Sequence, residues 1–172
     1  MNGEIHMFSI EVSNLHWLEG VDEREDLCLH GDAVVLIGHE RLEYQEATVS
    51  ATALYLLKSL SEDHIIYKSI QMLPCCGFSM YANDSLSAVE ISGCPNGVDW
   101  SVIHGEDCVL LVTESGNKTA IPMDEYKKTV FAFADQIEAF YRNSADKKLP
   151  RDKFDRDGYI AFWNEWKARR YE

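Results

Sequence analysis

The alternation of hydrophobic and polar positions is clearest between residues 98 and 141. Two β-rich runs are separated there by His104-Gly105-Glu106-Asp107, and Gly and Asp suit a hairpin turn. Pro122 then fits the first position of a helix, with Asp124 and Glu125 near the positive end of its dipole. Apolar side chains follow at helical spacing, at Tyr126, Val130, Phe133, Ile137, Phe140 and Tyr141. This pattern predicts a hairpin followed by an amphipathic helix.

The first third of the chain carries a similar pattern. Residues 5–13 are typical of a strand, and residues 14–26 of an acidic loop. Residues 27–37 predict a hairpin with its turn at His30-Gly31-Asp32, and a short strand is expected around residues 41–44. Apolar spacing then predicts a helix over about residues 47–60.

The order of elements suggests an internal repeat within one domain spanning residues 1–172. Residues 9–13 match residues 88–92, and residues 28–37 match the hairpin that begins at residue 102. The two halves would cover residues 5–62 and 86–143. Hairpins also resemble one another through composition alone, so duplication and chance similarity both stay open.

The remaining segments complete the predicted fold. Residues 61–85 look like a connector that crosses the core, and a last helix is expected over residues 155–170. That helix carries an aromatic stripe that we expect to pack on the sheet, formed by Tyr159, Phe162, Trp163 and Trp166. The predicted class is α+β, with mainly antiparallel sheet packed against two or three amphipathic helices.

Composition places the chain among folded proteins that need no membrane. Its 172 residues suit one ordinary domain, and 46% of them are hydrophobic. The first residues lack the basic-then-apolar order of a signal peptide, and no run of 18 apolar residues is present, so the cytoplasm is the expected location. Five cysteines without a Cys-x-x-Cys pair predict reduced and mostly buried thiols in that compartment.

The net charge of the chain favours some classes of partner over others. The formal net charge is −13, and residues 1–46 hold 11 acidic side chains against two basic ones. The tail from Ser144 has six acidic and eight basic side chains. A surface of this kind repels nucleic-acid phosphate and anionic lipid and attracts a basic protein. We therefore expect neither nucleic acid nor membrane as a partner, while oligomeric state stays unknown.

Candidate catalytic chemistry is limited to thiols. Cys75 or Cys76 could act as a nucleophile with His30 or His104 as its base. Adjacent cysteines on a strand point in opposite directions, so buried structural cysteines are the preferred interpretation. We predict no catalytic residue and no cofactor.

Two metal-binding patterns are incomplete. A zinc site would draw on Cys75, Cys94, His104 and Cys108. These four lack the close-paired ligands of structural zinc modules. The segment from Lys153 to Asn164 follows a calcium loop only in part, because a cation occupies the first ligand position and the closing glutamate is missing. We therefore predict no metal site.

The overall profile, small, acidic and without catalytic motifs, resembles the immunity proteins that bacteria keep in the cytosol to neutralise a cognate toxin, often a basic nuclease. The resemblance implies electrostatic blockade of a basic toxin. Trp17 would be the buried aromatic anchor of this contact. The carboxylates that would contact the toxin are those of Asp22, Glu23, Glu25, Asp26, Glu40, Glu43 and Glu46.

Two alternatives remain. One is a small thiol-dependent enzyme that uses Cys75 or Cys76 with a histidine. The other is a non-catalytic structural or regulatory subunit, whose contact would be the tryptophan-rich last helix.

Overall fold

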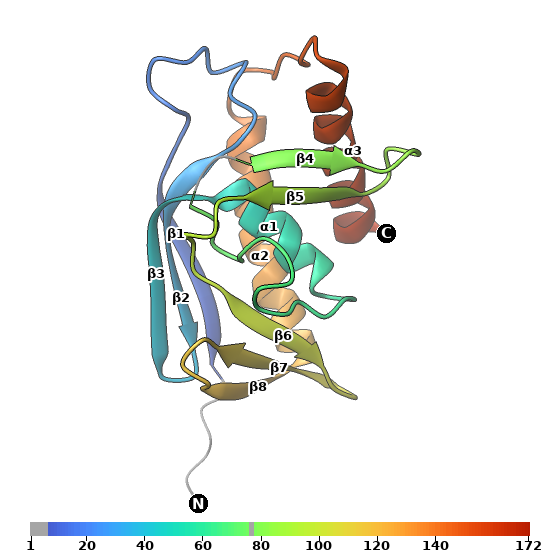
Figure 1. Cartoon of the computed structure of the whole chain (residues 1–172). Coiled ribbons are helices and arrows are strands. Elements are labelled where there is room, and N and C mark those ends of the chain that lie inside the picture. Colours follow the sequence, from blue (N-terminus) through green and yellow to red (C-terminus); the bar gives the residue numbers. More distant parts are fainter. Residues whose placement is uncertain (1–6, 76–77) are drawn as a thin grey trace, which may run out of the picture.

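The computed structural model describes residues 7–75 and 78–172. The fold is α+β, as predicted, and three helices pack against three antiparallel sheets in the described part of the chain (Figure 1). One buried hydrophobic cluster draws on all three sheets and all three helices.

The first sheet is built by the N-terminal strands. Strands β1 (Phe8–His16), β2 (His30–Ile37) and β3 (Glu40–Thr48) pair in that order. Side chains on one face, such as Val35 and Ile37, are fully buried. The chain then enters helix α1 (Val49–Lys58), in which every residue is buried. This helix therefore lies in the centre of the molecule, and Figure 1 shows it with α2 on one side of the first sheet.

The stretch with the clearest sequence pattern forms the predicted hairpin and helix. Strands β6 (Trp100–His104), β7 (Cys108–Thr113) and β8 (Lys118–Pro122) form a second three-stranded sheet. Helix α2 (Met123–Arg142) follows at once, with Pro122 as the residue that precedes its first turn. Its buried stripe consists of Tyr126, Val130, Phe133, Ala134 and Ile137.

A two-stranded sheet lies against the C-terminal helix. Strands β4 (Phe78–Ala82) and β5 (Val89–Gly93) pair with each other, and helix α3 (Lys153–Tyr171) packs on β4. Gly158 makes this close approach possible, because a Cβ atom there would lie 2.5 Å from the carbonyl oxygen of Met80. The helix begins slightly earlier than predicted, since Asp152 caps it by accepting a hydrogen bond from the backbone N–H of Asp155.

The predicted turn at His30-Gly31-Asp32 is wrong, because these residues lie inside β2. Gly31 packs so tightly on β1 that a Cβ atom would lie 3.0 Å from side-chain atoms of Leu15 and Val12. The chain reverses instead at Gly38, whose positive φ of 61° suits a hairpin turn. Glycine therefore serves strand packing at one position and the turn at the other.

The boundaries of the proposed repeat also change. Residues 88–92 belong mainly to β5, which pairs with β4 and not with the second three-stranded sheet. The expectation of a connector over residues 61–85 is wrong at its end, because β4 (Phe78–Ala82) lies there. Each half of the chain contains a three-stranded antiparallel sheet followed by a helix. Duplication remains a hypothesis.

Helix length and composition bear on membrane insertion. Within the described residues, none of the helices combines the length and apolar character required to cross a bilayer.

Candidate protein-binding surface

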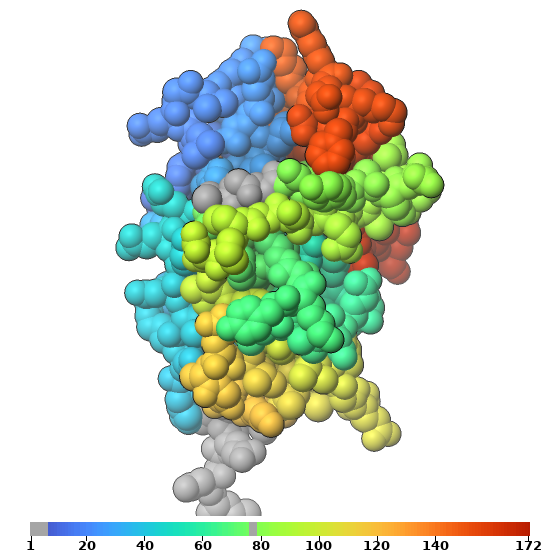
Figure 2. Space-filling model, in the orientation of Figure 1, coloured from blue at the N-terminus to red at the C-terminus, as the bar shows by residue number. Residues whose placement is uncertain are grey.

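The acidic loop between β1 and β2 is held against residues 144–148, which we call the basic segment. The backbone N–H of Lys148 donates to the carbonyl oxygen of Arg24 over 2.8 Å, and the Lys148 ammonium lies 3.1 Å from a Glu25 carboxylate oxygen. The backbone N–H of Ala145 donates to Glu23 over 3.1 Å. Figure 2 shows the blue loop in contact with the orange-red segment at the top of the molecule. Part of the loop charge is therefore neutralised within the chain.

Trp17 anchors the same contact from inside. Its indole N–H donates to the Ser144 hydroxyl over 3.1 Å, and its ring packs 5.6 Å from the Phe140 ring and 4.9 Å from the Tyr141 ring, centroid to centroid. The Lys147 ammonium lies over the indole face. The predicted anchor for a partner thus packs against the protein's own α2 helix and basic segment.

The two aspartates of the loop help to shape it. Asp26 is only 8% exposed, and its carboxylate accepts hydrogen bonds from the backbone N–H groups of Leu18 and Cys28. Asp22 accepts hydrogen bonds from the backbone N–H and the guanidinium of Arg24, which lower the pKa of its carboxyl. Little of Asp26 is therefore exposed to a partner, and Asp22 already has a cationic neighbour.

The three predicted carboxylates of β3 lie in different surroundings. Glu40 accepts hydrogen bonds from the Thr113 and Ser115 hydroxyls, which join the first sheet to the turn between β7 and β8. Glu46 is exposed and has a positive φ of 55°. Glu43 points away from the core and pairs with Arg41, with 3.0 Å between the nitrogen and oxygen atoms. Of these three glutamates, Glu43 alone lies on the broad outer face of the sheet.

That outer face brings a further carboxylate beside Glu43. Strand pairing places Glu11 of β1 opposite Val34 of β2, and Val34 opposite Glu43 of β3. Both glutamates are exposed and Val34 is half-buried. The next outward row is Ser9, Leu36 and Arg41, counted across the same three strands. We call this surface, made by Glu11, Asp32, Val34, Leu36, Arg41 and Glu43, the acidic sheet face.

Sequence reasoning missed Glu11 as a member of this face. The signal was present in the alternation Ile10-Glu11-Val12, which puts the glutamate on the side opposite two apolar residues. The cross-strand alignment with Val34 and Glu43 was hidden, because the predicted turn at residues 30–32 would have broken β2.

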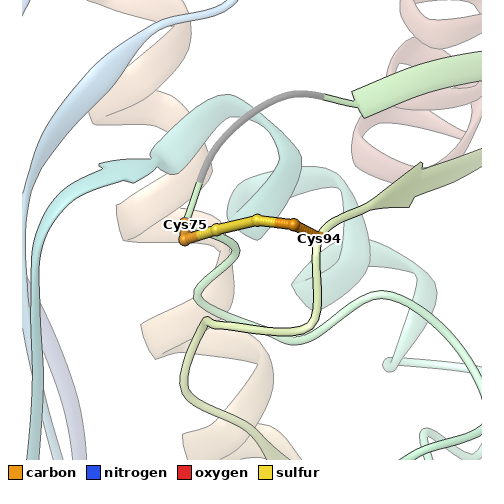
Figure 3. Close-up of a disulfide and its surroundings, with 2 residues drawn as sticks. All are labelled: Cys75 and Cys94. Atoms are coloured by element: carbon orange, nitrogen blue, oxygen red, sulfur yellow. A yellow bond between two sulfur atoms is a disulfide. The ribbon is translucent and has the colours of Figure 1, made fainter.

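The thiol chemistry is changed by a disulfide. Cys75, which precedes β4, is bonded to Cys94, which follows β5 (Figure 3). The predicted reduced state is therefore wrong for these two residues, and Cys75 is not a free thiolate nucleophile. Cys76 lies outside the described residues. Sequence could not identify the pair because 19 positions separate the two cysteines and no spacing motif marks them.

The histidines proposed as thiol bases are in separate places. His104 ends β6, and its Nδ1 atom lies 2.7 Å from a carboxylate oxygen of Asp63. His30 begins β2, and burial lowers the pKa of its imidazole. Cys28 is a half-buried residue, and desolvation of its free thiol raises the pKa and suppresses the thiolate form. These surroundings do not favour thiolate catalysis by Cys28, Cys75 or Cys94.

The aromatic stripe of α3 is used in the core. Phe162 and Trp166 are at most 1% exposed, and the half-buried Trp163 packs edge-on against Tyr141 with ring centroids 4.9 Å apart. A partner could reach only the margins of this stripe. The described residues contain no group of three or more His, Cys, Asp or Glu side chains placed to hold a metal ion.

In comparisons with known proteins, no family model, no curated protein and no solved structure matches the chain. The chemistry and placement of its own residues must therefore support any functional assignment.

Proposed function

We propose that this chain is an immunity-type inhibitor that binds and neutralises a basic bacterial toxin through the acidic sheet face. The observation that supports this most is the row of Glu11, Val34 and Glu43, in which two exposed carboxylates flank one half-buried aliphatic side chain. Such a row offers an apolar contact between two positions for cationic side chains.

The spacing of the row suits a pair of basic side chains. Adjacent strands lie about 4.8 Å apart, so the backbones of Glu11 and Glu43 are separated by roughly 10 Å across β2. One Lys or Arg of the partner can reach each carboxylate while an apolar side chain covers Val34. Arg41 already pairs with Glu43, so a partner's cation must compete with this exposed ion pair, which contributes little stability.

The charge of the whole chain supports fast association. A net charge of −13 accelerates the encounter with a basic protein and makes the encounter sensitive to salt. In this proposal Glu23 and Glu25 contribute to the long-range field, while their contacts with the basic segment hold the loop in place. Blockade follows if the toxin's basic cleft is covered.

The proposed place of action is the cytoplasm, and this location sets a requirement on the redox state of Cys75 and Cys94. The Cys75–Cys94 disulfide is typical of an oxidising compartment, whereas cytoplasmic cysteines are usually reduced. An inhibitor that acts in the cytoplasm would carry these thiols reduced. Alkylation of thiols in intact cells, before lysis, separates the two locations.

The proposal is tested by protection of cells. The proposal expects a neighbouring gene to encode the basic toxin. That polypeptide is expressed under an inducible promoter, with and without the chain, and survival is counted. We expect the native chain to protect and Glu11→Lys/Glu43→Lys to lose protection, because two repulsive charges replace two attractive ones. The matched control is Asp84→Lys/Glu106→Lys, which reverses two exposed charges outside the sheet face. Equal protection by both double variants would remove the sheet face from the proposal.

A further inference from the structure

A hydrogen-bonded chain of serine, histidine and aspartate lies outside the acidic sheet face. The Ser69 hydroxyl is 3.3 Å from Nδ1 of His64, and Nε2 of His64 is 2.8 Å from Oδ1 of Asp99. A nucleophile in reach of a base, and a base oriented by a carboxylate, is the arrangement that activates a hydroxyl for acyl transfer. The sequence pattern could not reveal it, because Asp99 is 35 positions from His64.

The histidine and aspartate are held rigidly. Backbone hydrogen bonds join His64 to Val102 in both directions, at 2.9 and 2.7 Å, so the loop is attached to β6. Oδ1 of Asp99 also accepts hydrogen bonds from the backbone N–H groups of Met72 and Trp100, each over 3.0 Å. His64 is 6% exposed and Asp99 2% exposed. The imidazole therefore has one defined orientation.

The carboxylate determines which nitrogen carries the proton. Asp99 accepts from the Nε2–H group of His64, which leaves the lone pair of Nδ1 free to accept from the Ser69 hydroxyl. The nearby carbonyl oxygen of Ile70 is farther away, at 3.5 Å. The roles of the two ring nitrogens are exchanged relative to the familiar serine-hydrolase arrangement, but the proton path is the same.

Ser69 is reachable from solvent through a small pocket. Its side chain is exposed, and together with His64 it lines a cavity of about 230 Å³. This volume is below the usual range for drug-sized ligands, so the cavity suits a small substrate. Lys58 lies in the wall of this cavity, where its ammonium group donates a hydrogen bond to the Val89 carbonyl oxygen and forms an ion pair with Glu165. Lys68 is a second cation in the same wall.

We propose that Ser69, His64 and Asp99 form a catalytic site that hydrolyses small carboxylic esters. Ser69 Oγ attacks the carbonyl carbon while its proton passes to Nδ1 of His64. The bond to the alcohol breaks, and His64 returns the proton to the leaving alkoxide. Water then gives a proton to Nδ1 of His64 while its oxygen attacks the acyl carbon. The bond from that carbon to Ser69 Oγ breaks, and His64 returns the proton to Oγ, which releases the carboxylic acid and restores Ser69. Asp99 stabilises the imidazolium, and Lys68 stabilises the oxyanion.

A structural role would explain only part of this arrangement. The pair of His64 and Asp99 can fasten the loop to β6 without a hydroxyl on the second ring nitrogen. Ser69 adds an exposed nucleophile where that fastening has no need of one. The site is independent of the proposed toxin inhibition, and the two can fail separately.

The test is covalent capture by a fluorophosphonate ester, located by peptide mass analysis. We expect one adduct per native chain, on Ser69, and none in Ser69→Ala. This substitution removes an exposed hydroxyl, so the unfolding midpoint should be preserved. Ser115→Ala is the matched control, because it removes an exposed serine outside the pocket and should label like the native chain.

Hydrolysis of p-nitrophenyl acetate gives the second readout. Turnover should vanish in Ser69→Ala and fall at least about 100-fold in His64→Gln, since proton transfer commonly contributes this much. If His64→Gln fails to fold, the comparison of Ser69→Ala with Ser115→Ala still decides. A native chain without an adduct, or an adduct that persists in Ser69→Ala, would overturn the proposal.

Discussion

The ammonium of Lys147 lies 3.2 Å from the centroid of the Trp17 ring and joins the basic segment to the end of β1. We expect Trp17→Ala to lower the free energy of unfolding by about 2 kcal/mol, because it removes half-buried aromatic packing and a cation–π contact. Urea denaturation measures the change. Lys147→Met is the control for the charge alone and should cost about 1 kcal/mol or less. An unchanged midpoint for Trp17→Ala would show that the loop is not anchored there.

A buried ion pair joins α1 to α3. The Lys58 ammonium lies 3.5 Å from a Glu165 carboxylate oxygen, and Glu165 is 3% exposed. We expect Glu165→Leu to lower the free energy of unfolding by about 3 kcal/mol. The substitution takes one carboxylate from the buried Lys58 ammonium, which keeps only the exposed Glu90 as an ionic partner, and it leaves the buried backbone N–H of Val89 without its acceptor. Lys58→Met/Glu165→Leu should recover part of this loss. If the double variant is as unstable as the sum of both single variants, the pair is not coupled.

The sequence predicts an element of the fold correctly where its local pattern and the tertiary packing favour the same structure. Helix α2 could be predicted because its apolar stripe, Pro122 and the acidic first turn all indicate the same element. The prediction of a turn at residues 30–32 is wrong because Gly31 is required for close packing of β2 on β1, and the sequence does not distinguish such a glycine from a turn glycine. Strand β4 was not predicted, although it has the same length as β5 and pairs with it.

The candidate site was less predictable than the fold. Local composition identified Glu43, but the row with Glu11 depends on strand register. Local composition also favoured Asp26 as a contact residue. In the structure Asp26 is buried, and its carboxylate accepts hydrogen bonds from two backbone N–H groups. Charge counts along a chain do not show which carboxylates fold inward.

Acid should destabilise the protein through His30. Burial lowers the pKa of this imidazole below its usual 6.5, although Asp26 and Glu46 oppose the shift and His16 adds to it. The unfolded chain therefore binds the proton first. Stability from this group is complete above pH 6.5, falls as the pH drops below 6.5, and levels off below the pKa of the folded state.

An NMR titration of the His30 ring and urea midpoints between pH 7.5 and 5 measure this effect. We expect His30→Gln to reduce the loss of stability over that interval. A His30 ring that titrates at or above 6.5 in the folded protein would contradict the prediction.

The disulfide predicts a specific thiol count. The chain has five cysteines, and Cys75 and Cys94 are bonded to each other. Alkylation in denaturant without a reductant should therefore modify at most three cysteines, and prior reduction should allow five. Intact mass gives the count. Five adducts without a reductant would contradict the disulfide between Cys75 and Cys94.

Loss of this bond should also destabilise the fold. A loop of about 15 to 20 residues predicts a contribution of about 3 kcal/mol from restriction of the unfolded chain. Cys94→Ser should show this loss in a urea titration, while Cys108→Ser, which removes a free thiol, should cost less. Equal midpoints for Cys94→Ser and the native chain would show that the bond contributes no stability.

Association kinetics with the basic toxin that the proposal expects a neighbouring gene to encode test the central claim most directly. The rate constant for Glu11→Gln/Glu43→Gln should fall about tenfold at low salt and depend less on salt than that of the native chain. Glu23→Gln/Glu25→Gln removes the same charge from the acidic loop and should have a smaller effect. Native association rates in the sheet-face variant, with the loop variant slowed, would contradict the account.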